Sequence, residues 1–349
     1  MLHIRTDGNA KIGTGHVMRC LEIAKAYRET VGPVQFLVAD ADSKSFIESM
    51  GFSCYQLDSK WNALEEEISK LKECKEKCSV ESLLIDSYYV TKEYVNSWKN
   101  LGVKVAYLDD LCKENYNVDM LFNGAIWATD QVYQKLYDDS TKKYMGCKYL
   151  PIRKEFSLLP EKEIKKTARK ILVLSGGTDP CHFLLRFVEN MPEDMARGYE
   201  YFLVCGIFND DYEKILEYCK DKPTIHVLRN VDNLYEYMMF SDVAVSAGGM
   251  TLYELCACGT CTITYLLADN QKGNIDGFVK EGLFETIGDI RENIDFEELF
   301  TKIDDLMADY DLRNATSKKI RSLVDGKGAY RIADKLNCMV LGEKNGTNL

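Results

Sequence analysis

Ile12-Gly13-Thr14-Gly15-His16 is the stretch of sequence that decides the fold. Residues 3–5 before it are typical of a short strand, and residues 16–27 after it carry apolar side chains at the steps of an amphipathic helix. The sequence therefore predicts a strand that passes through a glycine turn directly into a helix. Such a turn lets backbone approach a ligand, and the free N–H groups of a helix start favour negative charge there.

His16 is predicted to lie at the start of this helix. The positive end of the helix dipole disfavours a charged imidazole, so we expect a neutral ring that accepts a proton, as a general base must. The negative charges of Asp7 and of a bound diphosphate would instead raise the pKa of His16. An alternative is that His16 only caps the helix or packs beneath the glycine turn.

Length and composition limit the classes of function. A chain of 349 residues is long enough for two α/β domains. The net charge of −11 and the absence of a long basic run argue against nucleic acid or a membrane surface as a partner. There is no apolar segment near the roughly 20 residues of a membrane span, and no signal-peptide pattern. We expect a cytoplasmic monomer that binds a small molecule.

The thirteen cysteines are scattered through apolar segments without the spacing of a disulfide framework. Cys256, Cys258 and Cys261 are close enough in sequence to suggest a metal site, but no companion pair or histidine cluster completes it. We expect reduced, buried thiols, and neither a metal nor a cofactor.

Strand and helix patterns alternate along the chain and restart after a Pro-containing, charged segment at residues 151–167. The pattern predicts an α/β protein with two doubly wound, Rossmann-like domains that face a cleft, residues 1–155 and 168–349. Residues 61–78 are interpreted as a charged helix with a solvated face. A late helix at residues 330–339 has no predicted docking site. Strands are predicted at residues 3–5, 34–38, 54–57, 82–86 and 104–108, and then at 170–174, 201–205, 225–228, 242–246 and 261–265.

Polar residues follow several predicted strands, as at Asp86-Ser87-Tyr88-Tyr89 and Asp109-Asp110. In an open parallel sheet, the carboxyl ends of the strands form the edge where ligands bind. This edge is therefore the predicted location of the site.

Three glycine turns at helix starts offer backbone donors to phosphate oxygens, at residues 13–15, 176–177 and 248–249. Together they indicate a diphosphate, although each alone is also consistent with packing only. Glu254, one turn into the helix after Gly249, is placed to accept hydrogen bonds from two ribose hydroxyls. Its alternative interpretation is a solvated helix carboxylate.

Arg5-Thr6-Asp7, followed by residues 12–20, resembles the opening motif of the UDP-2,4-diacetamido-2,4,6-trideoxy-β-L-altropyranose hydrolases of pseudaminic acid biosynthesis and of related spore-coat polysaccharide proteins. The likeness covers most of the chain. The segment from Ser246 to Glu254 is shared more widely with muramyl-type glycosyltransferases, so it supports a GT-B-like fold and UDP binding better than the reaction. Further landmarks lie at residues 84–88, 108–111, 152–156, 175–179 and 269–271.

The resemblance implies hydrolysis of a UDP-linked diacetamido trideoxy sugar to free sugar and UDP, with inversion. It implies that His16 activates water, that Tyr88 and Asn270 lie near the reacting sugar, and that Glu254 holds the ribose. One departure is Ser87, where the family commonly has histidine. The residues expected to bind substrate are Asp7, Gly13, Gly15, Arg19, Gly177, Gly248, Gly249, Met250, Thr251, Glu254 and Gln271.

Two other functions fit the same motifs. A GT-B glycosyltransferase would pass the sugar to an alcohol or lipid acceptor, and incubation without acceptor distinguishes it from a hydrolase. A nucleotide-sugar sensor would bind without turnover, and loss of His16 would leave its binding unchanged.

Overall fold

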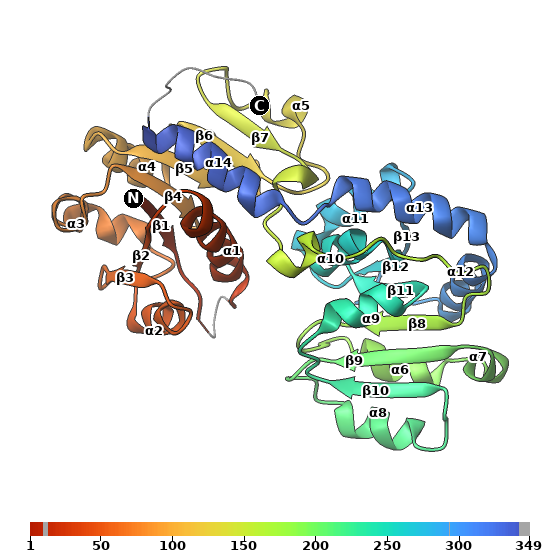
Figure 1. Ribbon diagram of the computed structural model, residues 1–349. Helices are drawn as coiled ribbons and strands as arrows, with labels where there is room; N and C mark the ends of the chain where they lie inside the picture. Colours follow the sequence, from red (N-terminus) through yellow and green to blue (C-terminus); the bar gives the residue numbers. More distant parts are fainter. Residues whose placement is uncertain (10–12, 293, 342–349) are drawn as a thin grey trace. The chain divides into compact units, whose positions relative to one another are not determined.

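The computed structural model describes residues 1–9, 13–292 and 294–341 and divides the chain into two α/β units (Figure 1). The first unit contains Met1–Lys154 and the chain from Gly326 onward, and the second contains Glu155–Asp325. Ile12 of the glycine turn lies outside the described residues.

The described part of the first unit contains one parallel sheet of seven strands in the order β3-β2-β1-β4-β5-β6-β7. Several predicted strands are confirmed, and two at one edge of the sheet were not predicted, β6 and β7. The strands are β1 (Leu2–Thr6), β2 (Val34–Val38), β3 (Ser53–Gln56), β4 (Ser82–Asp86), β5 (Lys104–Leu108), β6 (Met120–Asn123) and β7 (Lys142–Met145).

Both faces of this sheet are covered, because neighbouring strand residues belong to different core clusters. Leu84 packs into the cluster that contains the apolar face of α1, whereas Leu83 and Ile85 pack into the cluster on the other face. This alternation follows from the two-residue period of a strand. The helices of the unit are α1 (Gly15–Thr30), α2 (Ala41–Ser49), η1 (Leu64–Lys70), α3 (Leu71–Cys78), α4 (Lys92–Asn100), α5 (Asp130–Tyr133), η2 (Cys147–Tyr149) and α14 (Gly328–Leu341), and η3 (Lys154–Ser157) spans the boundary between the units.

The C-terminal helix α14 belongs to the first unit, whereas the sequence analysis included it in a C-terminal domain of residues 168–349. It lies beside α1 (Figure 1), and Ile332 and Leu336 are fully buried in the same cluster as Ile4. A hydrogen at Gly328 is required for this packing, since a Cβ there would lie 2.0 Å from the carbonyl oxygen of Leu150. The sequence did not assign this helix to the right unit, because an amphipathic pattern shows which face of a helix is buried but not which part of the protein covers that face.

Residues 61–78 differ from the predicted solvated helix. They form a 3-10 helix, η1, followed by the short helix α3, and Glu67 is fully buried. Its carboxylate accepts hydrogen bonds from Arg5 Nε and Nη2 at 3.1 and 2.5 Å and from the Tyr94 hydroxyl at 2.7 Å. Burial opposes the charge of Glu67, but Arg5 outweighs it and lowers the pKa of this carboxyl. The carboxylate is therefore part of a buried ion network beneath the sheet edge.

The described part of the second unit has one parallel sheet of six strands in the order β10-β9-β8-β11-β12-β13. Its last strand in sequence, β13, follows β12 and was not predicted from the sequence. The elements are β8 (Lys170–Leu174), α6 (Phe183–Glu189), α7 (Glu193–Gly198), β9 (Glu200–Cys205), α8 (Tyr212–Cys219), β10 (Ile225–Arg229), α9 (Leu234–Phe240), β11 (Val243–Ala247), α10 (Thr251–Cys258), β12 (Cys261–Leu266), η4 (Asp269–Gln271), α11 (Lys272–Lys280), β13 (Glu285–Asp289), α12 (Phe296–Ala308) and α13 (Tyr310–Leu323).

Lys162, in the segment that leads into the second unit, is a buried cation held by neutral acceptors. Its Nζ donates to the carbonyl oxygens of Met238 and Ser241 and to the hydroxyl of Thr260, at 2.6–2.9 Å. Burial lowers the pKa of Lys162 to about 8.

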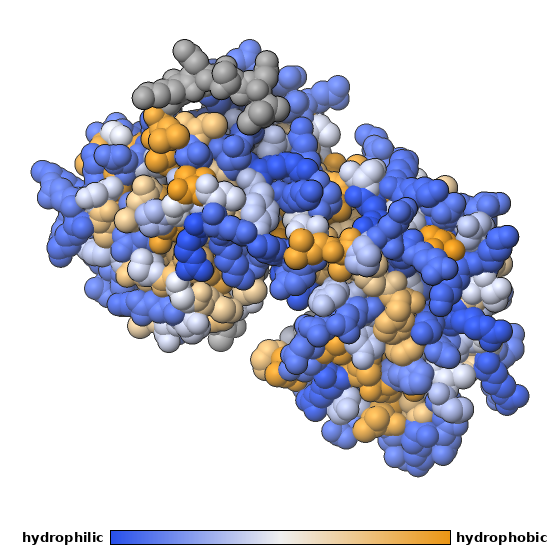
Figure 2. Space-filling model, in the orientation of Figure 1, coloured by the Kyte–Doolittle hydropathy of each residue, from blue (hydrophilic) through white to orange (hydrophobic). Residues whose placement is uncertain are grey.

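The surface is mainly hydrophilic on the face drawn in Figure 2, with hydrophobic patches interspersed on both units. In the part of the chain that the structure describes, none of the helices has the length and apolar character needed to span a bilayer. All thirteen cysteines lie among the described residues; they are free thiols, and eight are buried.

Candidate active site

The candidate site of the first unit lies at the carboxyl ends of three adjacent strands, β1, β4 and β5. Helix α1 begins after the turn that follows β1 and places His16 in its first turn. Asp86 is the last residue of β4, and Asp110 follows β5. The doubly wound topology thus brings side chains 70 and more residues apart in sequence to one sheet edge.

His16 forms a hydrogen-bonded pair with Asp86. Nδ1 of His16 lies 2.6 Å from Oδ1 of Asp86, and the Asp86 side chain is fully buried. Arg19, one turn further along α1, donates from Nε to the other carboxylate oxygen at 2.6 Å and from Nη1 to Asp110 at 2.8 Å. With Nδ1–H donated to the carboxylate, Nε2 is the ring nitrogen left to accept a proton.

The charge of Asp86 is maintained by its partners. Burial raises the pKa of a carboxyl, but the charges of Arg19 and His16 and their hydrogen bonds outweigh burial and hold the pKa of Asp86 well below its usual range. Asp86 therefore remains an anion next to the imidazole and favours a positive charge that develops on the ring.

A cavity of about 230 Å³ opens beside this pair and brings together three of the residues that the sequence analysis selected. Tyr88 packs edge-on against the His16 ring, with centroids 4.4 Å apart and an interplanar angle of 83°. Burial, followed by the charge of Asp110, raises the pKa of Tyr88 to about 12, so its hydroxyl stays protonated near neutral pH. The cavity is lined by Asp7, His16, Trp61, Asp86, Ser87, Tyr88 and Tyr89.

The other predicted residues of this unit have distinct positions. Arg19 is absent from the cavity lining and orients Asp86 from behind. Gly13 has a positive φ of 74° and donates its N–H to the carbonyl of Asn9 at 2.9 Å, which closes the turn. Gly15 is exposed as the first residue of α1, and a Cβ on it would meet no described atom within 4 Å. There is thus room for a ligand at the Gly15 backbone.

The second unit gathers its glycine turns in the same way. The turns follow β8 and β11, which are neighbours in the sheet, and η4 follows β12, the next strand. Gly177 lies against Gly206, where an added Cβ would come 2.2 Å from the Gly177 carbonyl oxygen. Helix α6 begins only at Phe183, so the turn after β8 is longer than expected.

The turn after β11 is held by hydrogen bonds to β12 and α11. Gly248 donates to the carbonyl of Tyr265 at 3.0 Å, and its own carbonyl accepts from Asn274 at 3.2 Å. An added Cβ on Gly249 would have only Nε2 of Gln271 within 4 Å, at 3.8 Å. This backbone is therefore both held in place and accessible.

The remaining predicted residues surround this turn. Met250 and Thr251 form the N-cap and first residue of α10, and Glu254 is half-buried in the same helix. Gln271 accepts from the backbone N–H of Leu267 at 3.1 Å, and Asn270 is exposed in η4. These five residues belong to one edge of the second unit.

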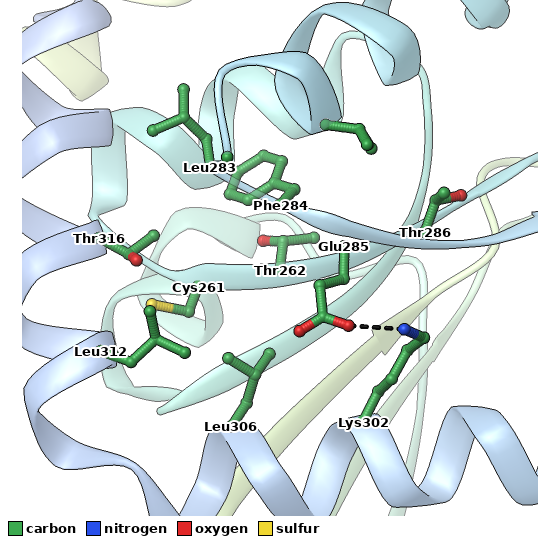
Figure 3. A pocket seen from close by; sticks show the side chains of 12 residues that line it. Cys261, Thr262, Leu283, Phe284, Glu285, Thr286, Lys302, Leu306, Leu312 and Thr316 are labelled. Carbon is green, nitrogen blue, oxygen red and sulfur yellow. Dashed lines mark hydrogen bonds and ion pairs between the residues drawn. The ribbon is translucent and has the colours of Figure 1, made fainter.

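A larger cavity, of about 390 Å³, lies elsewhere in the second unit (Figure 3). It is lined mainly by apolar side chains between β12, β13, α12 and α13, with the Glu285–Lys302 ion pair on one side. Cys261 and Thr262 open β12, so this cavity lies at the amino ends of the strands, opposite the glycine turns.

Four lining residues of the first cavity were not among the predicted site residues: Trp61, Asp86, Ser87 and Tyr89. The last three follow or end a predicted strand at the edge where the site was expected. Trp61 begins the charged stretch at residues 61–78, which was predicted to be a solvated helix. The feature of the sequence that could have marked Trp61 is that it is the one aromatic residue in that stretch. Among residues 1–9, 13–292 and 294–341, no group of three or more His, Cys, Asp or Glu side chains is arranged to hold a metal ion.

Comparison with known proteins supports the fold. Residues 171–336 match the family model described as Glycosyltransferase family 28 C-terminal domain. The structure superimposes on MurG of Acinetobacter baumannii with a TM-score of 0.71 at 14% sequence identity, over 96% of this chain and 98% of MurG. The chain thus has the two Rossmann-like parallel α/β domains of the GT-B glycosyltransferases, as predicted.

Relatives with similar sequences have different names. The spore coat polysaccharide biosynthesis protein SpsG of Bacillus subtilis is 25% identical over 94% of this chain and 95% of its own length. The UDP-2,4-diacetamido-2,4,6-trideoxy-beta-L-altropyranose hydrolase of Campylobacter jejuni is 24% identical, over 80% of this chain and 96% of its own. An uncharacterized protein of Methanocaldococcus jannaschii, MJ1062, is 24% identical over 80% of this chain, which spans only 58% of that relative. The sequence likeness therefore extends across both units.

Proposed function

We propose that this protein hydrolyses a UDP-linked 2,4-diacetamido-2,4,6-trideoxy sugar to the free sugar and UDP, as a step of pseudaminic acid-type nonulosonate biosynthesis. We also propose that the protein is a cytoplasmic monomer and that it needs no cofactor.

The observation that carries the proposal is the His16–Asp86 pair beside a cavity. Asp86 fixes the imidazole through Nδ1, and the ring remains partly accessible, with 14% of its side-chain surface exposed. Within the described residues, no hydrogen bond occupies Nε2. A ring held in this way is equipped to take a proton from water.

The reaction needs one base and no acid. The water oxygen forms a bond to the anomeric carbon, its proton passes to Nε2 of His16, and the electron pair of the breaking C–O bond leaves with UDP. Ordinary glycosides need a carboxylic acid to protonate the leaving oxygen, but a diphosphate leaves as a stabilised anion. Attack from the face opposite UDP gives inversion.

We propose that the second unit holds the UDP. The turns at Gly177 and at Gly248–Gly249 offer backbone donors for the charge that develops on the diphosphate. Glu254 would bind the ribose, Asn270 would lie near the reacting sugar, and the C. jejuni relative, which is named as such a hydrolase, supports the reaction. A placed base contributes about 10² to 10⁴-fold, so positioning and charge stabilisation must supply the rest.

A glycosyltransferase is the second candidate, favoured by the family model over residues 171–336 and by the likeness to MurG. In such an enzyme, an acceptor hydroxyl would take the place of water at His16. Both candidates use the same base and the same donor, so only the fate of the sugar separates them.

The test uses the purified full chain and its UDP-linked sugar without any acceptor, in ¹⁸O-labelled water. We expect release of UDP together with free sugar that carries ¹⁸O at the anomeric carbon, and NMR should show the inverted anomer first. Intact donor until an alcohol is added would favour a transferase, and binding without turnover would favour a sensor.

The His16→Gln variant should keep its affinity for UDP and lose about 10² to 10⁴-fold in kcat. His226→Gln is the matched control, because His226 lies on the edge strand β10, where it stacks on Phe202. Equal losses in both variants, or activity retained in His16→Gln, would overturn the assignment of His16 as the base.

A further inference from the structure

The carboxylates that line the cavity beside His16 are already engaged by the protein. Asp7 accepts from the backbone N–H of Ala39 at 2.7 Å and from Arg5 Nη1 at 2.5 Å. Asp86 accepts from His16 and Arg19. Both carboxylates are buried and salt-bridged, so the wall that remains available to a ligand is largely aromatic.

Trp61 and Tyr89 form that wall. Their rings meet edge to face, with centroids 5.3 Å apart at an interplanar angle of 76°, and Tyr89 is 43% exposed. Trp61 is half-buried beside it. Aromatic rings that remain accessible next to a partly exposed proton acceptor offer a ligand a large apolar contact surface.

Both rings are held in position by the backbone around them. Tyr89 lies in a turn where its N–H donates to Ser87 Oγ at 3.1 Å, and the Ser87 carbonyl accepts from the Tyr107 hydroxyl at 3.3 Å. Trp61 lies two residues after Ser59, whose hydroxyl donates to the buried Glu67 at 2.7 Å. The chain next to Trp61 is therefore tied to the buried ion network that holds Asp7, and the turn at Tyr89 is tied to Ser87 and Tyr107.

The aromatic side of this cavity suits a sugar with few hydroxyl groups. Its volume of about 230 Å³ has room for a ligand of monosaccharide size. A fully hydroxylated hexose facing two aromatic rings would leave its hydroxyl groups without partners, at a cost for each. Methyl groups of a deoxy or N-acetylated sugar bury apolar surface there instead.

We propose that Trp61 and Tyr89 are specificity-determining residues that bind the methyl-bearing face of the substrate sugar and select deoxygenated, N-acylated sugars over hydroxylated ones. This inference rests on the proposed function, because it assigns the sugar to the cavity beside His16. Ser87 adds a small side chain to the same wall and leaves the two rings accessible.

The kinetic test compares donors that differ by one methyl or one hydroxyl group. The series is the UDP-linked 2,4-diacetamido trideoxy sugar, its 6-hydroxy analogue, and the analogues in which either acetyl group is replaced by formyl. The wild-type enzyme should discriminate against at least one analogue by about tenfold or more in kcat/KM. Trp61→Ala should lose that discrimination while Trp61→Phe, which keeps an aromatic face, retains most of it. Unchanged discrimination in Trp61→Ala would overturn the proposal.

A binding test separates this inference from the proposed reaction. The chain has three tryptophans, Trp61, Trp98 and Trp127, so protein labelled with 5-fluorotryptophan gives three ¹⁹F resonances, and Trp61→Phe assigns one of them. Titration with the free diacetamido trideoxy sugar should shift the Trp61 resonance and leave that of the fully buried Trp98 in place.

The outcomes are distinguishable. A shift at Trp61 in a protein without turnover would support the sugar wall and contradict the hydrolase. Turnover with no shift at Trp61, and with normal discrimination in Trp61→Ala, would support the hydrolase and contradict the wall. A shift that UDP alone produces would also contradict it.

Discussion

Replacement of Asp86 by asparagine tests the His16–Asp86 pair, on which the candidate site depends. The side chain is fully buried and accepts hydrogen bonds from His16 and Arg19. Asparagine is nearly isosteric but uncharged, and its NH₂ group would face the donors of Arg19. Removing one partner of a buried ion pair costs about 3–5 kcal/mol. Because Arg19 keeps its contact with Asp110, we expect the lower limit, about 3 kcal/mol, or a Tm lower by roughly 6–12 °C.

The same change should reduce kcat by about 10³ to 10⁴-fold, because an amide that donates to Nδ1 places the imidazole proton on Nε2. Stability should also depend on pH in a defined direction. The pKa of Asp86 is lowered in the folded protein, so its contribution is fully present above its ordinary value of 3.8 and is lost as the pH falls below it. The difference in unfolding free energy between wild type and Asp86→Asn should therefore be constant from pH 7 to about pH 5 and shrink in more acidic buffer.

Asp110→Asn is the matched control, since it removes the same charge from the same arginine. The Asp110 side chain is 29% exposed and does not contact His16 in the described structure, so we expect a loss of about 1 kcal/mol or less and a smaller fall in kcat. Thermal denaturation and steady-state kinetics provide the measurements. An Asp86→Asn protein with a Tm within about 2 °C of wild type and kcat within about tenfold would refute the reasoning.

Three further changes test other parts of the molecule. Lys162→Met removes a cation whose pKa is lowered to about 8, so the stability advantage of wild type over the variant should grow by about 2 kcal/mol from pH 8 to 10, measured by urea denaturation; a shrinking advantage would contradict the burial. Gly249→Ala has space for its methyl group, so it should weaken UDP binding about tenfold by calorimetry without changing Tm, whereas Gly206→Ala, which clashes with backbone, should lower both. Leu336→Ala in α14 should destabilise the first unit by about 2–5 kcal/mol and leave UDP affinity unchanged; reduced UDP affinity instead would contradict the placement of this helix.

The strands that the sequence predicted correctly are those with the plainest local signal. Residues 34–38, 82–86 and 104–108 each contain three or four apolar residues in five, and the structure confirms them as β2, β4 and β5 with the same bounds. The strand β7, with the sequence Lys-Lys-Tyr-Met, and β13, which contains glycine, were missed because each lies at the edge of its sheet, where less of a strand must be apolar.

Errors in the site came from interactions between distant parts of the chain. Glu67 looked like a solvated charge because its partner, Arg5, is 62 residues away in sequence. Trp61 was missed for the same reason, because the residues with which it lines the cavity, such as His16 and Tyr89, are distant from it in sequence. His16, Tyr88 and Asp7 were predicted through a motif and do line one cavity, whereas their roles in a reaction stay predictions.

The charges at the carboxyl edge of the first unit's sheet indicate which part of the proposed substrate this unit can bind. Two arginines, Arg5 and Arg19, are paired there with four carboxylates, those of Asp7, Glu67, Asp86 and Asp110, which leaves a net charge of −2 at neutral pH. An acidic cluster stabilises an imidazole that gains a proton, and it repels a diphosphate. For the proposed substrate, we therefore expect the sugar rather than the diphosphate at the first unit. The Gly13–Gly15 turn, one of the three turns that the sequence offers to a diphosphate, suits it poorly because of these carboxylates.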